Sequence, residues 1–280
     1  MEYRADLLIS ELADKLKNLF EDDPVVALAG AHAKGVADSK SDLDIFLFGK
    51  SPKSHDERLK IIQEICDSGT APYVSWDFSM PWGGGADFTY KGGKVEAVLR
   101  TFEQTEQVIS RCMNGEFDII PQTWTSNGYY TYIYLSEMSF MKPVYDPDGW
   151  LCQMKQKTET FPEKLRKSII DVFLDRAGTW IDNFHYESAV ERGDTLFVAP
   201  IVVHTVMDMI QVVFALNGRY FTGDKKVEAA LRKMPYCPKS LLDNLELLLT
   251  FNKDIEMLRH QAVVLKDVYY ELRDYGDQTV

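Results

Sequence analysis

Two apolar segments joined by a turn of small residues constrain this chain more than any other part of its sequence. The first segment, Val25 to Ala29, runs directly into Gly30, and the second, Leu43 to Phe48, follows a short polar connection. Each is short, apolar and bounded by turn residues, which is typical of a buried strand. The pattern therefore predicts two neighbouring strands of one sheet.

Two carboxylates, Asp42 and Asp44, stand where the second strand begins. Side chains alternate along a strand, so both leave the same face as neighbours. Adjacent like charges repel each other and persist where something compensates them; hard oxygen ligands suit Mg²⁺. The preceding turn offers backbone N–H groups at an expected helix N-terminus, which is a natural phosphate site. A phosphate cradle beside metal-binding carboxylates indicates phosphoryl or nucleotidyl transfer.

These motifs resemble the signature of the DNA polymerase beta-like nucleotidyltransferase superfamily. That signature is a Gly-Ser or Gly-Gly turn followed by Asp-x-Asp or Asp-x-Glu on a strand. Gly30 and Ala31 stand at the turn, Lys34 to Asp38 resembles an Arg-Gly-x-Ala-Asp stretch of many members, and Ser41 to Asp44 matches the acidic element. The departure is Ala31, where serine is usual, so a hydroxyl contact to the triphosphate is missing.

The resemblance implies roles for these residues. Asp42 and Asp44 are expected to bind two Mg²⁺ ions together with an NTP, for which ATP is the first expectation. The expected nucleotide contacts in this segment are Gly30, Ala31, Lys34 and Ser41. The resemblance further implies a third carboxylate on a neighbouring strand, which binds metal or acts as general base toward an acceptor hydroxyl.

Glu96 is our candidate for that third carboxylate, both as metal ligand and as catalytic residue. It lies inside the apolar run Val95 to Leu99, where a lone carboxylate is costly unless it is used. The alternative is an outward-facing strand residue whose neighbours face inward. Asp87 is the rival candidate and Asp77 a weaker one. Gly92-Gly93 between the two runs predicts a hairpin turn.

Composition limits the classes of partner. The chain has 280 residues and a formal net charge of −12. Proteins that grip nucleic acid usually present a basic face, so we expect no nucleic-acid partner and prefer a small cationic acceptor. No apolar run is expected to span a bilayer, and four scattered cysteines indicate reduced thiols in a cytoplasmic protein. Whether the chain forms a homodimer is left open.

The pattern of elements predicts an α+β protein of two domains. Residues 1–150 are expected to form a nucleotidyltransferase-like mixed sheet with flanking helices, and residues 151–280 an all-α helical bundle that binds the acceptor. The turn chemistry of Tyr145 to Gly149 places the boundary. A third strand is expected from Tyr73 to Phe78, and Pro81 to Gly85 is expected to be a flexible loop over the site.

The helical half contributes further candidates. The loop from Asn217 to Lys225 resembles a loop in relatives whose lysine meets nucleotide phosphates, which makes Lys225 a nucleotide-binding candidate and Lys226 its alternative; a helix end with solvated lysines explains the loop equally well. The aromatic stretch Trp124 to Tyr134 is expected to pack between domains rather than stack on a base or sugar. Acids on the bundle helices that could hold a cationic acceptor, but are more often salt-bridged, are Asp182, Glu187 and Asp208.

The sequence therefore predicts a Mg²⁺-dependent nucleotidyltransferase. It would move a nucleoside monophosphate from an NTP to a hydroxyl of a small molecule, such as an aminoglycoside-like antibiotic, and release pyrophosphate. The resemblance is to the antibiotic nucleotidyltransferases, which combine a minimal catalytic domain with a C-terminal bundle. Two alternatives stay open: a nucleotidyltransferase that modifies protein side chains, and a non-catalytic nucleotide sensor.

Overall fold

The computed structural model describes residues 2–38 and 40–279, with side chains from residue 8 onward. The chain forms two compact units that are discontinuous in sequence. Unit 1 comprises residues 1–111 and 134–160, and unit 2 comprises residues 112–133 and 161–280. The chain thus passes between the units at residues 111/112, 133/134 and 160/161, so the segment around the aromatic stretch belongs to the helical unit.

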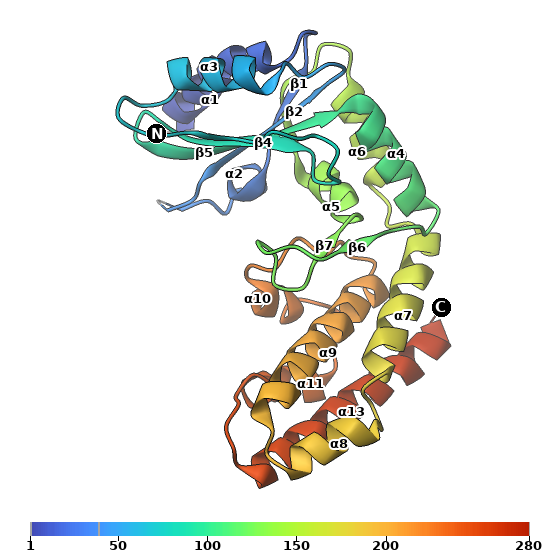
Figure 1. Cartoon of the computed structure of the whole chain (residues 1–280). Coiled ribbons are helices and arrows are strands. Elements are labelled where there is room, and N and C mark those ends of the chain that lie inside the picture. Colours follow the sequence, from blue (N-terminus) through green and yellow to red (C-terminus); the bar gives the residue numbers. More distant parts are fainter. Residues whose placement is uncertain (1, 39, 280) are drawn as a thin grey trace. The chain divides into compact units, whose positions relative to one another are not determined.

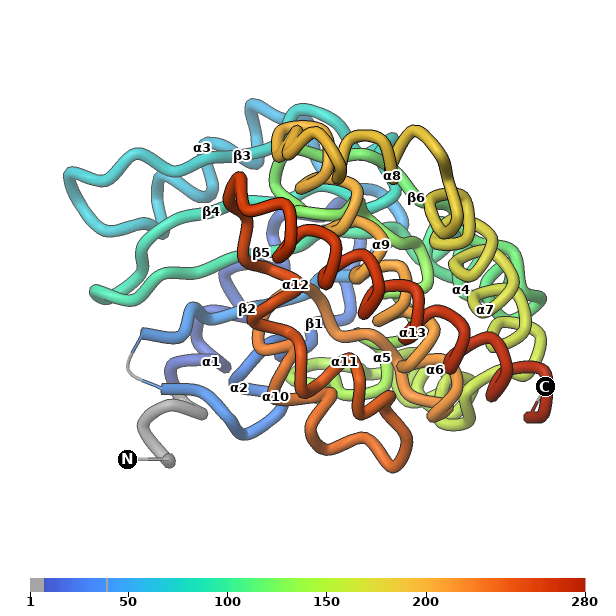
Figure 2. Tube along the Cα trace, turned by 90° about the horizontal axis from the view of Figure 1, so that it is seen from below, coloured from blue at the N-terminus to red at the C-terminus, as the bar shows by residue number. Residues whose placement is uncertain are grey.

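Unit 1 is built on a mixed sheet of six strands in the order β3-β4-β5-β2-β1-β8 (Figures 1 and 2). Strands β2 and β5 pair in parallel, and the other neighbours pair antiparallel. The sheet with its helices and the helical remainder confirm the predicted α+β class. The strands are β1 (Val25–Leu28), β2 (Leu43–Gly49), β3 (Tyr73–Val74), β4 (Gly84–Tyr90), β5 (Gly93–Thr101) and β8 (Lys142–Tyr145).

One face of the sheet is the hydrophobic core of unit 1. Helices α1 (Glu2–Leu16) and α3 (His55–Ile65) lie over this face (Figure 1). The strands present every second side chain to them, and Ile45, Leu47 and Ala97 are completely buried. Burial of one such aliphatic side chain contributes about 1.5–3 kcal/mol. This face holds the sheet together and leaves the opposite face free for polar groups.

The opposite face carries polar groups near the helices α2 (Gly30–Lys34) and α5 (Ile133–Phe140). Arg100 of β5 is 1% exposed there, and its Nη1 lies 2.6 Å from Oε2 of Glu137. Its guanidinium also lies 3.7 Å from the centre of the Tyr134 ring and 5.0 Å from that of Phe46. A buried charge is tolerated when it is paired, so this ion pair makes α5 an integral part of unit 1.

The segment between β3 and β4 is tied to its neighbours at several carbonyl groups. Strand β3 ends at Val74, earlier than predicted. The Ser75 N–H still donates to the Gly85 carbonyl of β4, and the carbonyl groups beyond Val74 then accept hydrogen bonds from side chains. The prediction of a flexible loop from Pro81 to Gly85 was also wrong. Gly84 and Gly85 belong to β4, and the residues before them accept hydrogen bonds. The bonds run from Arg58 Nη2 to Ser75 O (2.9 Å), Gln104 Nε2 to Met80 O (2.9 Å), Tyr134 Oη to Pro81 O (2.5 Å) and Arg100 Nε to Trp82 O (3.2 Å).

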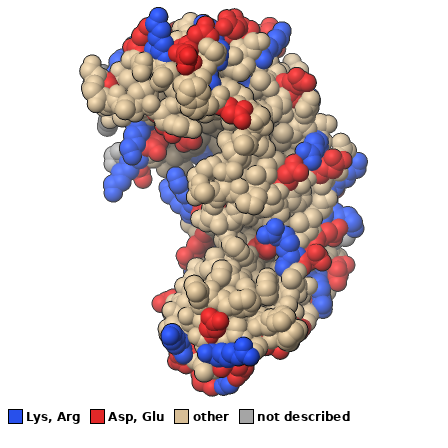
Figure 3. Space-filling view, in the orientation of Figure 1, with Lys and Arg blue, Asp and Glu red and all other residues tan. Residues whose placement is uncertain are grey.

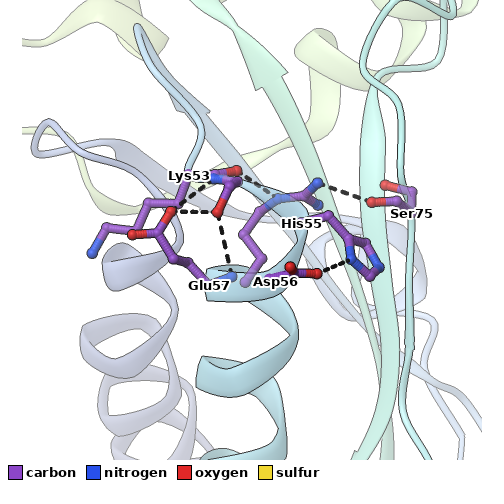
Figure 4. A network of polar contacts seen from close by, with 7 residues as sticks. Lys53, His55, Asp56, Glu57 and Ser75 are labelled. Carbon is purple, nitrogen blue, oxygen red and sulfur yellow. Dashed lines mark hydrogen bonds and ion pairs between the residues drawn. The ribbon is translucent and has the colours of Figure 1, made fainter.

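The start of α3 anchors one end of this segment. Ser54 caps the helix and Glu57 reaches back to the Ser54 backbone N–H, which forms a capping box (Figure 4). Caps of this kind contribute about 1 kcal/mol. The ring of His55 stacks on Trp76 with centroids 3.5 Å apart. The first turn of α3 therefore fixes both the helix and the segment after β3.

Unit 2 is helical apart from one short hairpin, β6 (Ile119–Ile120) with β7 (Tyr129–Tyr130). Aromatic packing ties this hairpin to the helices: Tyr130 stacks on Tyr132, and Tyr132 donates a hydrogen bond of 2.7 Å to Gln211. The helices after residue 160 are α7 (Glu163–Gly178), α8 (Phe184–Glu191), α9 (Thr195–Leu216), α10 (Val227–Leu231), α11 (Lys239–Asp243), α12 (Leu245–Leu248) and α13 (Ile255–Thr279).

Helix α9 has the length and composition of a membrane-spanning helix, alone among the helices of the described residues. The expectation that no run is long enough was therefore wrong. In unit 2, however, 61% of its most apolar window is buried, as in the core helix of a helical domain.

Leu47→Ala should lower the free energy of unfolding by about 2–5 kcal/mol, because Leu47 is completely buried in the core face and truncation leaves a cavity. Urea denaturation followed by circular dichroism measures this. The matched control is Leu196→Ala, where the same truncation at a residue 88% exposed should change stability by about 0.5 kcal/mol or less. Equal losses in both variants would contradict the assignment of the core face.

Candidate active site

Three carboxylates form a row on the face of the unit 1 sheet that lies opposite the hydrophobic core, which we call the open face. Asp44 of β2 pairs with Glu96 of β5, and Glu96 pairs in turn with Asp87 of β4. Directly paired residues point to the same face, and neighbouring strands lie about 4.8 Å apart. Asp42, two residues before Asp44, belongs to the same side by alternation. The structure therefore brings Asp42, Asp44, Glu96 and Asp87 together. The weaker candidate, Asp77, instead accepts hydrogen bonds from the N–H and the hydroxyl of Ser79.

Asp44 is fixed by close packing against Gly30. A Cβ atom added at Gly30 would lie 1.6 Å from Oδ2 of Asp44, and the φ of Gly30 is +56°. Only glycine fits, because any side chain would displace the carboxylate and strain the backbone. The Ala29 N–H also donates a 2.9 Å hydrogen bond to the Asp44 carbonyl. Glycine at the start of the Gly30-Ala31 turn thus allows this carboxylate to approach the backbone at the start of α2.

Lys34, at the end of α2, places a positive charge near this row. Its ammonium lies 4.0 Å from the centre of the Phe140 ring. Partial burial lowers the pKa of Lys34, while the negative charges of Asp44 and Glu137 oppose that shift. A partly desolvated ammonium beside a carboxylate is suited to meet a phosphate group.

Asp87 lies at a cavity of about 420 Å³ on this face. The residue is exposed, yet partial burial of its carboxyl group raises the pKa of Asp87, and the nearby charge of Asp42 raises it further. The cavity is lined by Asp42, Thr70, Ala71, Asp87, Phe88, Thr89, Lys94, Val95 and Glu96.

Glu96 points away from the hydrophobic core. Its neighbours Val95 and Ala97 are buried, whereas Glu96 is exposed. The outward orientation considered as an alternative is therefore the observed one. It does not conflict with a catalytic role, because the outward face is the face that carries Asp44 and Asp87. The use of Glu96 rather than Asp87 as third carboxylate stays a prediction.

Ser41 is engaged within the turn that precedes Asp42. Its hydroxyl accepts a 2.9 Å hydrogen bond from the Asp38 N–H and donates one of 3.2 Å to the Asp38 carboxylate. This arrangement shapes the entry into β2. A nucleotide contact by Ser41, like one by Ala31 within α2, stays a prediction.

The donor chemistry of the row fits Mg²⁺, which prefers carboxylate oxygens. Among the residues that the structure describes, however, no three His, Cys, Asp or Glu side chains converge as a ready metal cage. Like charges spread apart when nothing compensates them. The residues that would hold the metal are Asp42, Asp44 and Glu96, and the packing of Asp44 against Gly30 orients the central one.

Comparison with protein families agrees with this geometry. Residues 9–84, which contain Gly30, Asp42 and Asp44, match the model of the nucleotidyltransferase domain family. This part of the chain is a nucleotidyltransferase domain of the DNA polymerase beta-like superfamily. The protein is accordingly an enzyme of the nucleotidyltransferase type, and its general chemistry is nucleotidyl transfer. Residues 134–226 match a second family, a domain of unknown function (DUF4037).

A solved structure gives a weaker likeness. It is that of a nucleotidyltransferase-like protein from Exiguobacterium sibiricum 255-15, with 12% identity and a TM-score of 0.48, over 98% of this chain and 76% of that one. No curated protein matches the chain.

The helical unit contains the remaining predicted residues. Lys225 is exposed in a turn before α10, and Asp224 beside it accepts a hydrogen bond from the Ser126 N–H. Two bundle acids are salt-bridged: Asp208 to Arg176 at 3.1 Å, and Asp182 to Lys266. Asp182 also accepts a hydrogen bond from the Tyr270 hydroxyl. A nucleotide contact by Lys225 stays a prediction.

Sequence reasoning missed Glu137 and Arg100 of unit 1. Glu137 pairs with Arg100, and its charge acts on Lys34, so it links α5 to two basic groups of the open face. Arg100 could have indicated this ion pair in the sequence, because a charged residue at the end of an apolar strand requires a partner when it is buried. That partner lies far along the chain, beyond the reach of local patterns.

Gly30→Ala should lower the rate of nucleotidyl transfer by about 100-fold or more, because the new Cβ displaces the Asp44 carboxylate by an ångström or more. The measurement is pyrophosphate release at saturating NTP. Gly35→Ala is the matched control, since Gly35 also has a positive φ of +70° but open space around its Cβ position. It should cost about 1–2 kcal/mol of stability and leave the rate nearly unchanged. Equal activity of the two variants would contradict the proposed contact.

Proposed function

We propose that this nucleotidyltransferase transfers a nucleoside monophosphate from an NTP, with ATP as the first candidate, to a hydroxyl group of a small molecule. The observation that carries the proposal is the row of Asp44, Glu96 and Asp87 on the open face, with Asp44 packed on Gly30. In the transfer, the acceptor oxygen bonds to the α-phosphorus, the bond from that phosphorus to the bridging oxygen breaks, and pyrophosphate leaves.

The acidic residues divide the work in this proposal. Asp42 and Asp44 would hold two Mg²⁺ ions, with Glu96 completing the ligand set or taking the proton of the acceptor hydroxyl. Bound Mg²⁺ supplies stabilisation of the attacking and leaving oxygens. Asp44 can do so because Gly30 fixes its carboxylate, and Glu96 because its strand pairing places it beside Asp44.

The nucleotide would lie on the α2 side of Asp44. Lys34 would meet the phosphates, since its ammonium is near enough for the charge of Asp44 to act on its pKa. The turn residues Gly30 and Ala31, with Ser41, would contribute the remaining contacts of unit 1. Lys225 is a further candidate for a nucleotide contact. Ala31 brings no hydroxyl group, so backbone groups and Lys34 carry more of the phosphate binding here.

The acceptor is proposed to be a small cationic molecule, of which an aminoglycoside-like antibiotic is one example. The net charge of −12 favours a cation over a polyanion. On the face of the molecule in Figure 3, lysine and arginine side chains are interspersed with acidic ones rather than gathered in one patch. A cytoplasmic location and the absence of nucleic-acid and membrane partners belong to the same proposal.

Acceptor-dependent pyrophosphate release tests the proposal. Purified protein with Mg²⁺ and each of the four ribonucleotides is assayed against aminoglycosides, lincosamides and simple polyols. We expect release with at least one acceptor, and a loss of about 1,000-fold or more in Asp44→Asn, which removes a metal-binding charge at constant shape.

The other outcomes separate the alternatives. Nucleotide binding that depends on Mg²⁺ without turnover on any small molecule would overturn the proposed acceptor class and favour a protein acceptor or a sensor, for which Ala31 is the supporting feature. A protein substrate would then be sought by transfer of labelled nucleotide to added polypeptides. Absence of nucleotide binding would overturn the proposal as a whole.

A further inference from the structure

The row of carboxylates continues to an exposed aromatic ring at the sheet edge. Tyr73 of β3 pairs directly with Asp87 of β4, so the row across four strands is Tyr73, Asp87, Glu96 and Asp44. Tyr73 is 59% exposed on the edge strand β3, so its ring is accessible to a ligand. The two strand spacings from Tyr73 to Glu96 span roughly 10 Å, which is the scale of a small ring-bearing molecule.

The cavity at Asp87 has polar groups that the protein itself does not use. Among the residues that the structure describes, Asp87 has no hydrogen-bond or ion-pair partner. The Thr89 hydroxyl, which also lines the cavity, is buried and lacks a hydrogen-bond partner there too. Buried polar groups without partners are uncommon in native proteins, and a ligand is one explanation of them.

The charge of the cavity favours a cation. Its lining includes three carboxylates, Asp42, Asp87 and Glu96, against one ammonium, Lys94. If Asp42 and Glu96 serve the metal ions, Asp87 remains as the charge that faces the rest of the cavity. Partial burial strengthens its attraction for an ammonium group, because the local dielectric is lower than that of water.

The geometry of the reaction also favours an acceptor site at the cavity beside Asp87. In an in-line displacement the acceptor oxygen approaches the phosphorus from the side opposite to the leaving pyrophosphate. In the proposed function, Lys34 and Gly30 would hold the pyrophosphate on the α2 side of Asp44. The opposite direction along the row leads from Glu96 to Asp87 and then to Tyr73.

We propose that Asp87 and Tyr73 form an acceptor subsite that selects a hydroxylated ring compound carrying an ammonium group. Asp87 binds the ammonium, the ring of Tyr73 stacks against the apolar face of the compound, and Glu96 meets the reacting hydroxyl. Charge-assisted hydrogen bonds and aromatic faces are the usual means by which proteins hold such molecules. This inference rests on the proposed function and names specificity residues for it.

The test uses two probes that differ in one group. Glucosamine carries an ammonium where glucose carries a hydroxyl, and binding of each to the full chain is followed by NMR titration, with Mg²⁺ and a non-hydrolysable ATP analogue and without them. Wild-type protein should bind glucosamine more tightly than glucose. Asp87→Asn should weaken glucosamine binding by about tenfold, the effect of one charge-assisted hydrogen bond, and glucose binding far less.

Two further variants make the result specific. Tyr73→Ala should weaken the binding of both sugars to a similar degree, because stacking does not depend on the ammonium. Asp14→Asn is the matched control: Asp14 is 70% exposed on α1, away from the row, and should leave both affinities unchanged. Circular dichroism and the affinity for the ATP analogue, measured on every variant, show that the fold and the nucleotide site are intact.

The outcomes distinguish this inference from the proposed function. Wild-type protein that binds the ATP analogue but neither sugar, or equal glucosamine binding by wild type and Asp87→Asn, would overturn the subsite and leave the proposed nucleotide chemistry standing. Failure to bind the ATP analogue would count against the proposed function. The sugar titrations without nucleotide would then still decide the subsite by the effect of Asp87→Asn.

Discussion

The contact between the Asp44 carboxylate and the backbone of Gly30 is the constraint on which the site depends. A Cβ atom at residue 30 would lie 1.6 Å from Oδ2, and the positive φ of Gly30 disfavours other residues as well. The hydrogen bond from Ala29 N–H to the Asp44 carbonyl holds the same pair on the backbone side. The end of β1, the first residue of α2 and the start of β2 therefore act as one unit. Steric exclusion, rather than loop flexibility, explains why the turn begins with glycine.

The two faces of the sheet separate stability from chemistry. The covered face is apolar and buried, so it can hold the strands without any help from charged groups. The open face then tolerates an alternation of charge, in which Lys34 lies near Asp44 and Glu137, and Glu137 pairs with Arg100. Each basic group faces an acidic one, which offsets the cost of partial burial. A carboxylate row can persist beside these pairs because it lies toward the exposed end of the strands.

Local patterns in the sequence predicted much of the fold. The strands predicted at Val25 to Ala29 and Leu43 to Phe48 form within one residue of the predicted bounds, because each is a short apolar run bounded by turn residues. The segment after Tyr73 was misjudged for the opposite reason. The sequence predicts a strand followed by a glycine-rich break, but the carbonyl groups of this segment accept hydrogen bonds from side chains of α3, α4 (Phe102–Met113), β5 and α5. Those donors are distant in sequence, so no local pattern reveals them.

The carboxylate row shows which contacts of the site local sequence patterns can predict and which they cannot. The pairing of Asp87 with Glu96 follows from the hairpin, because Tyr90 pairs with Gly93 across the two-residue turn Lys91-Gly92, both with positive φ. A turn of that length fixes the register. The turn predicted at Gly92-Gly93 was therefore one residue off, because Gly93 already belongs to β5; that turn would have paired Glu96 with Thr89 instead of Asp87. The pairing of Glu96 with Asp44 is different, since β2 and β5 are parallel and joined by a long connection through α3, β3 and β4. Only the packing of the whole sheet sets that register. A slip of one residue there would turn Glu96 toward the core while leaving the hairpin intact, and so the third carboxylate could be named from the sequence but not aligned with the first two.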